Sequence, residues 1–266
     1  MTRSPMELFP VETSLIAEHD DLAQVFISAL KRNGLTLNDG DVVVVASKVV
    51  GLVEGKVRRV SDVKVTKEAT KLATKNKVTP ALMQLILGES DSIVGGSPGF
   101  ILAVRKGFPC VNACIDSANS PIDSFTLPPD DADESARLMR ERIIDSTGKR
   151  VAVVVADSGL LPGRRGTIGV ALGFAGLKPL KNYVGRKDLY GRSLRVTFQS
   201  VIDDIASAAK LLMGEADERV PFVLVRDAPV EYTEERIGID STILPFNICI
   251  FMNSIRSRRT TRSIRR

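Results

Sequence analysis

Apolar residues follow helical spacing in one part of the chain and form continuous runs in another. After the polar residues at 19–21, apolar positions recur at steps of three and four residues, which predicts an amphipathic helix ending near residues 33–34. These apolar positions are Leu22, Val25, Phe26, Ala29 and Leu30. The run DVVVVA at 41–46 is continuous and rich in β-branched residues, so it predicts a strand covered on both faces.

Further elements follow from the same patterns. Strands are expected near residues 55–60, at 100–106 (FILAVRK), at 150–156 (RVAVVVA) and at 221–227 (PFVLVRD). Two helices are expected within residues 65–88, and the second of them begins at Thr79-Pro80. Another helix is expected after the break at 128–131, and a further one from about 196 to 213. Residues 107–121 are rich in small and polar side chains and are expected to form a loop.

The order of these elements indicates the fold class. Several neighbouring strands are joined by segments too short for a crossover helix, which disfavours a doubly wound parallel sheet. We therefore expect an α+β fold with mixed and antiparallel sheets and interleaved helices. Residues 1–250 are expected to form the main region, as one domain or two subdomains, and residues 251–266 a basic, flexible C-terminal tail.

The composition is typical of a soluble globular protein, with 44% hydrophobic and 26% charged residues. No apolar run approaches the roughly 18 residues that a membrane helix needs. The first residues also lack the apolar stretch of a signal peptide. We therefore expect a cytoplasmic protein with no membrane partner.

The positive charge is concentrated at one end of the chain. The formal net charge is +5, but residues 255–266 hold six arginines and no acidic residue. Without them, 31 basic residues face 32 acidic ones, so the body is close to neutral. Such a tail can make non-specific contacts with polyanions, although a solvated chain end is the more common case. Nothing else in the chain indicates nucleic-acid recognition.

The cysteines and the single histidine do not form a motif. Cys110, Cys114 and Cys249 contain no C-x-x-C pair, and an odd number favours reduced, packed thiols over disulfides. His19 lies far from all three and is more consistent with a helix-start residue than with a metal ligand or a catalytic base. Any metal ion in this protein should therefore be a hard cation held by oxygen, such as Mg²⁺ or Mn²⁺.

Oxygen-bearing side chains gather at three places beyond predicted elements. Asp116 lies in the loop after the strand at 100–106, Asp157 and Ser158 follow the strand at 150–156, and Glu215 follows the helix that ends at residue 213. Carboxylates on loops held by a rigid sheet are frequent metal and catalytic groups. Each alone can also be an ordinary turn or cap residue.

A lysine at the end of the first buried strand offers a site for phosphate. Ser47 and Lys48 follow the DVVVVA strand, where an ammonium can bind a phosphate as a point charge. The alternative is a surface lysine at a strand end. The chain has no G-x-x-x-x-G-K-[ST] or G-x-G-x-x-G pattern and no G-x-S-x-G nucleophile motif. General acid–base chemistry would therefore fall to carboxylates or lysine.

Taken together and in order, these segments resemble the coenzyme F420-0:L-glutamate ligase family, the γ-glutamyl ligases of a deazaflavin coenzyme. The resemblance spans residues 8–227 and lies in the ordered set rather than in any one piece. The matching pieces are Pro10, Asp20-Asp21-Leu22, residues 40–48, Glu54-Gly55, residues 112–119, Asp157-Ser158, Arg164 with Gly166, Gly173 with Gly176, Gly185, Asp188, Gly191-Arg192 and residues 208–215.

The resemblance implies a GTP-dependent ligase, comprising residues 1–250, that joins L-glutamate to F420-0 through an acyl phosphate. It implies an unusual α+β fold that forms an intertwined homodimer. It also implies two divalent ions, Mg²⁺ or Mn²⁺, with the first on Asp116 and Asp157 and the second on Ser158 and Glu215; a K⁺ ion is compatible with it. The implied GTP contacts are Leu8, Phe9, Pro10, Val11, Ser47, Lys48, Asn119, Met213, Gly214, Ala216, Asp217 and Glu218.

Three basic residues are assigned catalytic roles within this expectation. Lys48 is expected to stabilise the transferring phosphoryl group, where negative charge accumulates. Arg164 and Arg192 are candidates for holding the carboxylates of glutamate, because they lie beside the metal-binding segments in sequence.

The chain also departs from the family pattern. Leu52 stands where the family usually has a second lysine, and Leu160-Leu161-Pro162 replaces a Gly-Arg-Pro. Ala118 replaces a serine, and Glu215 stands where some members use glutamine. Because the implied metal ligands are retained, a working nucleotide site is favoured. Two alternatives stay open: a related carboxylate–amine ligase with a different acceptor, and a nucleotide-binding homologue without turnover.

Overall fold

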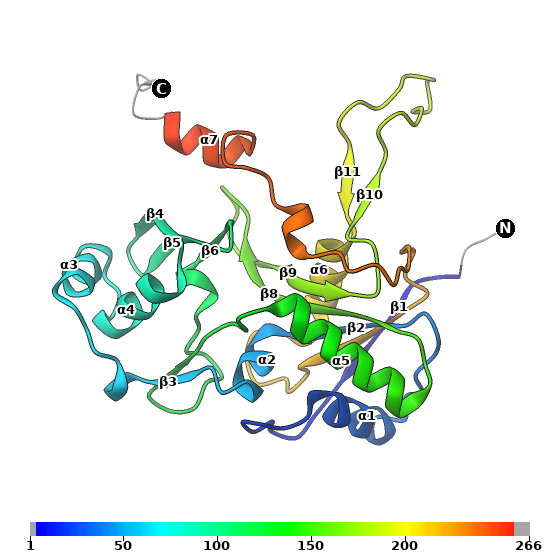
Figure 1. The fold of residues 1–266 in the computed structure, drawn as a ribbon, viewed down its shortest axis with the longest axis horizontal. Coiled ribbons are helices and arrows are strands. Elements are labelled where there is room, and N and C mark those ends of the chain that lie inside the picture. The colour runs from blue at the N-terminus through cyan, green and yellow to red at the C-terminus, as the bar shows by residue number, and fades with distance from the viewer. Residues whose placement is uncertain (1–3, 258–266) are drawn as a thin grey trace.

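The computed structural model describes residues 4–257, and a five-stranded mixed sheet lies at its centre (Figure 1). The strand order is β1-β12-β2-β8-β9, in which only β2 and β8 pair in parallel. These strands are β1 Glu7–Val11, β12 Phe222–Arg226, β2 Val42–Ala46, β8 Ala152–Leu160 and β9 Thr167–Ala175. The expected α+β class with mixed and antiparallel sheets is therefore confirmed.

Helices cover both faces of this sheet. Val43 and Val45 of β2 pack in one core with α1 (Leu22–Arg32), α2 (Ser47–Val53) and α5 (Ala132–Thr147). Val42 and Val44 point to the opposite face, where they pack with α6 (Val201–Met213). The continuous valine run is buried on both sides, as its pattern predicts.

Helix α1 begins and ends where the sequence predicts. The Asp21 carboxylate caps it by accepting hydrogen bonds from the amides of Ala23 (3.0 Å) and Gln24 (3.3 Å). At the other end, the Asn33 side chain donates to the carbonyl of Ala29 (2.8 Å). The apolar face of α1 is buried against the sheet, and this burial of hydrophobic surface holds the helix in place.

A second lobe has its own core. It contains two helices, a three-stranded antiparallel sheet and a short 3-10 turn, η2. Their bounds are α3 Lys67–Asn76, α4 Pro80–Glu89, β4 Ser92–Ser97, β5 Phe100–Arg105, β6 Phe108–Val111 and η2 Asn112–Cys114. Beside it, β3 (Val57–Arg59) pairs with β7 (Ser124–Thr126). Cys110 and Cys114 lie in this lobe as free thiols, consistent with the expected packing role.

Two segments project from the body (Figure 1). The first, which we call the arm, is the hairpin of β10 (Leu180–Asn182) and β11 (Phe198–Ser200) with its loop. The second is α7 (Ile250–Ser257), which comes after the short 3-10 turn η3 (Ile239–Thr242). A further 3-10 turn, η1 (Val60–Asp62), follows β3. Of the predicted tail, residues 251–257 belong to α7, and residues 258–266 lie outside the described part. No helix within residues 4–257 is long and apolar enough to cross a membrane.

Several element predictions need correction. The strand expected at 150–156 continues to Leu160, so Asp157 and Ser158 lie inside β8. The loop expected at 107–121 contains β6 and η2, and the helix expected from 196 begins at Val201 because β11 occupies its first residues. The elements α2, β4 and β9 were not predicted; β9 carries glycines that resemble loop residues.

Candidate functional site

A cavity of about 710 Å³ opens at the carboxyl end of β2. The parallel pairing of β2 with β8 places Ala46 opposite Ala156, so Ser47 and Lys48 lie beside Asp157 and Ser158. All four of these polar residues line the cavity. Ligands commonly bind outside the carboxyl ends of strands, where neighbouring chains diverge.

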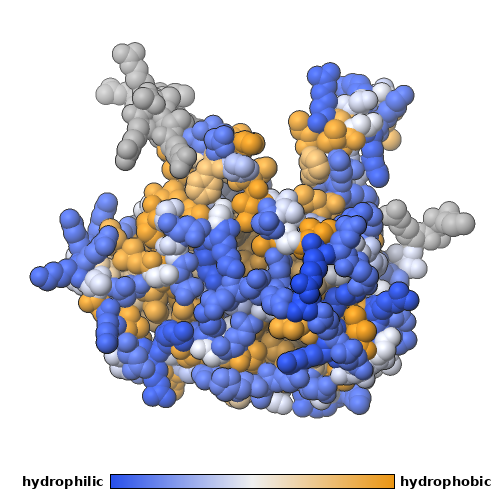
Figure 2. Space-filling view, viewed as in Figure 1, coloured by the Kyte–Doolittle hydropathy of each residue, from blue (hydrophilic) through white to orange (hydrophobic). Residues whose placement is uncertain are grey.

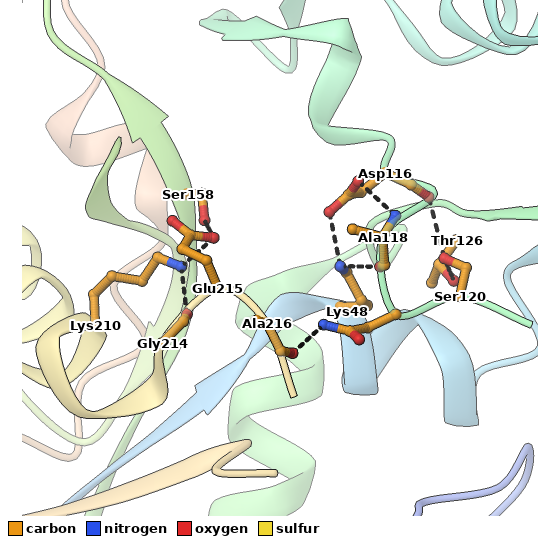
Figure 3. A network of polar contacts seen from close by, with 11 residues as sticks. Lys48, Asp116, Ala118, Ser120, Thr126, Ser158, Lys210, Gly214, Glu215 and Ala216 are labelled. Carbon is orange, nitrogen blue, oxygen red and sulfur yellow. Dashed lines mark hydrogen bonds and ion pairs between the residues drawn. The ribbon is translucent and has the colours of Figure 1, made fainter. Parts of the chain in front are cut away.

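One wall of the cavity is organised around Lys48, in the first turn of α2 (Figure 3). Its ammonium donates to Oδ2 of Asp116 (2.7 Å) and to the carbonyl of Ala118. The other carboxylate oxygen of Asp116 accepts from the Ala118 amide (3.0 Å). Although burial opposes ionisation, these bonds from Lys48 and Ala118 hold the pKa of Asp116 below its ordinary value. Asp116 is therefore an ionised carboxylate at neutral pH.

A second wall is organised around Glu215, just after α6 (Figure 3). Lys210 pairs with its Oε2 (2.8 Å), Ser158 donates to the same oxygen (3.4 Å), and Thr167 donates to Oε1. Partial burial alone would raise the pKa of Glu215, but the bonds from Lys210, Thr167 and Ser158 lower it. Donors from α6, β8 and β9 thus fix this carboxylate in its ionised form.

Asp157 lies between these two walls and is partly buried on β8. Burial raises the pKa of Asp157, opposed by hydrogen bonds from the Ser158 amide and the Ser47 hydroxyl. Among residues 4–257, no ion pair involves Asp157. Its charge is therefore less compensated by basic side chains than those of Asp116 and Glu215, each of which has a lysine partner.

Two loops meet across the floor of the cavity. The side chain of Asn119 donates to the carbonyl of Ala216 (2.6 Å), and the Ala216 amide donates to the Glu218 carboxylate (2.8 Å). These contacts connect the loop that carries Asp116 with the loop that carries Glu215. The three acidic segments expected from the sequence thus line the same cavity.

The structure separates the predicted site residues into two groups. Those that line the cavity are Ser47, Lys48, Asp116, Asn119, Asp157, Ser158, Met213, Gly214, Glu215, Ala216 and Asp217. Those outside its lining are Leu8, Phe9, Pro10, Val11, Glu218, Arg164 and Arg192. The first four form most of β1, and Glu218 reaches the cavity only through its bond to Ala216. Arg164 lies in the turn between β8 and β9, and Arg192 lies on the arm, where it pairs with Asp188 (2.9 Å). The roles expected for these residues stay predictions.

Two further cavity residues, and one residue that contacts Glu215, are not singled out by their sequence context. Lys210 and Arg219 line the cavity, and Thr167 at the start of β9 binds Glu215. No hydrogen bond or ion pair of the Arg219 side chain is present in the described region, so its guanidinium is available to an anion. Lys210 precedes Glu215 by five residues, and α6 ends at Met213 between them, so no helical i,i+3 or i,i+4 spacing relates the two in the sequence.

The side chains on the cavity walls suit a hard cation. The expected ligands Asp116, Asp157, Ser158 and Glu215 offer only oxygen, the donor that Mg²⁺ and Mn²⁺ prefer. Within residues 4–257, however, no three His, Cys, Asp or Glu side chains converge on one point. This arrangement fits ions that keep water and phosphate oxygens among their ligands, as Mg²⁺ usually does in phosphate-transfer sites.

A smaller cavity of about 330 Å³ lies on the other side of β2, beneath α1, α2 and α5. His19 lines it from a left-handed turn (φ 68°) just before α1, as expected for a helix-start residue. Glu54 also lines it and accepts a hydrogen bond from Ser135 (2.5 Å).

Comparison with known proteins gives a consistent set of relatives. Residues 10–227, which include nearly all of the larger cavity's lining, match the family described as F420-0:Gamma-glutamyl ligase. The coenzyme F420:L-glutamate ligase of Archaeoglobus fulgidus is 41% identical over 222 residues, which cover 83% of this chain and 87% of the relative. The protein of the same description from Methanothermobacter thermautotrophicus is 38% identical over 238 residues, or 89% of this chain and 94% of the relative.

Proposed function

Because the chain belongs to the F420-0:gamma-glutamyl ligase family, we propose that it joins L-glutamate to the carboxylate of coenzyme F420-0 in a GTP-dependent reaction. The relatives from Archaeoglobus fulgidus and Methanothermobacter thermautotrophicus are described as coenzyme F420:L-glutamate ligases. This chain covers most of their length, so the comparison concerns whole catalytic chains rather than a shared fragment.

The observation that carries the proposal is the convergence of three carboxylates and two lysines on one cavity. Asp116, Asp157 and Glu215 come from separate segments, and Lys48 and Lys210 reach the first and the last of them. A cavity of about 710 Å³ falls within the size range of nucleotide and cofactor sites. Phosphoryl transfer needs this combination of hard-cation ligands and positive charge.

The proposed reaction has two steps. A carboxylate oxygen of F420-0 attacks the γ-phosphorus of GTP, the bond to the β–γ bridging oxygen breaks, and an acyl phosphate and GDP form. The amine of glutamate then attacks the acyl carbon, phosphate leaves with the electron pair of its bond to carbon, and the new amide loses one proton. Two divalent ions on Asp116 with Asp157, and on Ser158 with Glu215, would offset the charge of the transferring phosphoryl group.

The residues of this chain supply positioning and charge for these steps. Lys48 lies where an ammonium can reach a phosphate from the end of β2, and Arg219 presents a second positive group to the cavity. The side-chain amide of Asn119 donates to the loop that carries Glu215, so it fixes the position of that loop relative to the loop that carries Asp116. A pre-organised set of charges of this kind lowers the barrier because little reorganisation remains for the reaction itself.

We also propose that the protein acts as a homodimer in which the arm packs on the partner. Figure 2 shows apolar surface on the projecting arm, where Leu189, Tyr190 and Val196 are strongly exposed. Side chains of this kind on a long hairpin are typical of a surface covered by another chain.

The direct test of function is a GTP-consumption assay with Mg²⁺ or Mn²⁺, in K⁺ and in Na⁺ buffers, with product identified by mass. We expect GDP and phosphate to form only when both L-glutamate and F420-0 are present, with a mass increase of one glutamyl residue. GTP binding without consumption in the complete mixture would contradict the proposal and favour a non-catalytic homologue.

A different acceptor is the second candidate, and one observation favours it. Leu52 lines the cavity at the position where the family usually has a lysine, so α2 presents an apolar side chain there, one turn beyond Lys48. An apolar wall would suit an acceptor that is less anionic than F420-0. Glutamate-dependent GTP consumption with another carboxylate acceptor, and none with F420-0, would support this alternative.

A further inference from the structure

The carboxylates on both walls of the larger cavity are already neutralised by lysines of the chain. Lys48 lies 2.7 Å from Asp116, and Lys210 lies 2.8 Å from Glu215 (Figure 3). The side chains of the two lysines are only 25% and 16% exposed, whereas those of their carboxylate partners are 53% and 56% exposed, so water reaches each pair from the carboxylate side. These are two of the carboxylates that the proposed function assigns to divalent ions.

A lysine and a divalent ion bound to the same carboxylate oppose each other at these distances. Mg²⁺ or Mn²⁺ approaches a ligand oxygen to about 2.1 Å. The ammonium and the ion would then lie only a few ångströms apart in a partly desolvated cavity, where like charges repel strongly. Each ammonium therefore opposes the binding of an ion at its carboxylate, and its movement away from the carboxylate relieves that repulsion.

The structure also shows how each lysine can move without losing its place. Lys210 donates to the carbonyl of Gly214 (3.1 Å) as well as to Glu215, and Lys48 donates to the carbonyl of Ala118 as well as to Asp116. An ammonium has three donors on a flexible stem, so it can rotate from a carboxylate to a phosphate while remaining near its backbone partner. The phosphates of a nucleotide in the cavity are the anions that can accept it.

From these contacts we infer that Lys210, and Lys48 on the opposite wall, are exchangeable counter-ions. Without ligands they neutralise Glu215 and Asp116; when divalent ions enter, they transfer to the nucleotide phosphates. The inference rests on the proposed function in taking Glu215 and Asp116 as ligands of divalent ions and a nucleotide phosphate as the acceptor. The inference predicts that nucleotide affinity depends on Lys210 when divalent metal is present. Without metal, Lys210 stays bound to Glu215, so nucleotide affinity should not depend on it.

A structural role for Lys210 leads to the opposite result. If Lys210 served to hold Glu215 in position, its removal would misplace a metal ligand and weaken metal binding. If it competes with the ion, its removal strengthens metal binding in the nucleotide-free protein. The sign of the change in Mn²⁺ affinity therefore distinguishes the two roles.

The experiment measures Mn²⁺ binding to the full chain by electron paramagnetic resonance of the free ion, without nucleotide. We expect Lys210→Met to bind Mn²⁺ about tenfold more tightly than the unaltered protein, a typical size for coupling between neighbouring sites. Lys210→Arg, which keeps the charge, should stay close to the unaltered protein. The matched control is Lys178→Met, which breaks a Lys–Glu pair with Glu231 (2.5 Å) that does not line the cavity.

A second measurement follows GDP binding by calorimetry. In EDTA, Lys210→Met should bind GDP as tightly as the unaltered protein; with saturating Mn²⁺ it should bind GDP about tenfold more weakly, as expected on losing a charge-assisted hydrogen bond. Weaker Mn²⁺ binding by Lys210→Met, or an equal loss of GDP affinity with and without metal, overturns the exchange. Thermal unfolding confirms that each variant is folded.

These outcomes separate the inference from the proposed function. Ligase turnover with Mn²⁺ affinity unchanged in Lys210→Met overturns the exchange and leaves the function in place. The expected changes in Mn²⁺ and GDP binding, without any turnover, support the exchange and contradict the ligase assignment. Failure of the unaltered protein to bind either Mn²⁺ or GDP overturns both.

Discussion

The ammonium of Lys48 lies 2.7 Å from Oδ2 of Asp116, although 68 positions separate the two residues in the chain. Their meeting depends on the close packing of α2 against the backbone that follows β7. A Cβ atom placed on Gly51 of α2 would lie 2.1 Å from the carbonyl oxygen of Leu127. Asp116 is joined to the same segment by a backbone bridge to Thr126. Gly51 therefore lets α2, which carries Lys48, approach the segment that holds Asp116.

Replacing Gly51 by alanine should damage both stability and activity. The added methyl group collides with backbone, which cannot move aside as a flexible side chain can. We expect a loss of about 1–3 kcal/mol in unfolding free energy, measured by urea denaturation, with reduced turnover as Lys48 and Asp116 separate. Gly88→Ala is the matched control: it lies in α4 with open space around its Cβ, so it should gain about 0.5–1 kcal/mol. Equal effects of the two substitutions would contradict this account.

Asp157→Asn should separate activity from stability. The burial that raises the pKa of Asp157 also makes its charged form costly in the fold, so an uncharged amide should leave the melting temperature equal or higher. The same change removes a proposed metal ligand, and we expect turnover to fall at least about 100-fold. Asp145→Asn, on the exposed face of α5, is the control and should change neither quantity. Full activity of Asp157→Asn would remove this residue from the site.

Leu52→Lys tests the apolar cavity wall. Leu52 lines the cavity from α2, one turn beyond Lys48, so a lysine there would direct a second ammonium toward bound phosphate. We expect the KM for GTP to fall about fivefold, which corresponds to roughly 1 kcal/mol for a partly exposed charged hydrogen bond. Leu52→Met keeps the apolar character and should leave KM unchanged. The same KM in both variants would show that this wall does not contact the nucleotide.

Some of this fold could be read from spacing alone, and the rest depends on contacts that spacing does not contain. The helical period around Phe26 and the unbroken valines of β2 predict α1 and β2 because burial dictates those patterns. Strand β9 was missed because Gly169 and Gly173 look like loop residues. A Cβ at Gly169 would lie 2.2 Å from the carbonyl oxygen of Ala206, so the glycine is there to admit α6.

The candidate site divides along similar lines. Asp116, Asp157 and Glu215 could be identified because their residue types and their order along the chain resemble a known pattern. The pairing of Lys210 with Glu215 could not, because it depends on the backbone turn at Gly214 that ends α6. Arg164 and Arg192 were placed by proximity in sequence, yet the hairpins that carry them extend away from the cavity lining.

Glu54→Gln should change how stability depends on pH. Loss of hydration beside the smaller cavity raises the pKa of Glu54 above 4.5, even though its side chain reaches solvent. A carboxyl with a raised pKa in the fold adds stability as pH falls through that pKa, and the gain ends near pH 4.5, where the unfolded chain is also protonated. Glu54→Gln should therefore be slightly more stable than the unaltered protein at pH 7 and equal to it near pH 4.5, as measured by urea denaturation.

The control for this pH dependence has the opposite sign. Hydrogen bonds from Arg137 lower the pKa of Glu134, so its ionised form stabilises the fold above pH 4.5 and this contribution is lost as pH falls below it. Glu134→Gln should therefore lose less stability than the unaltered protein as the pH falls below 4.5. Glu54→Gln, by contrast, should lack the gain in stability that the unaltered protein shows as the pH falls towards 4.5. If both variants shift the pH profile in the same direction, local desolvation of Glu54 does not explain its behaviour.

The arm provides the last test, because it carries large apolar side chains that are exposed in the single chain. Leu189 is fully exposed and Val196 is 84% exposed, although both are apolar and project on one hairpin. If the arm packs on a second copy, Leu189→Glu combined with Val196→Glu should convert the dimer to a monomer in sedimentation velocity, since burying two carboxylates in an apolar contact is costly. Leu211→Glu, at a residue 85% exposed on α6, is the matched control and should leave the dimer intact. A monomeric unaltered protein at micromolar concentration, or a dimer that survives the double substitution, would exclude the arm as the dimer contact.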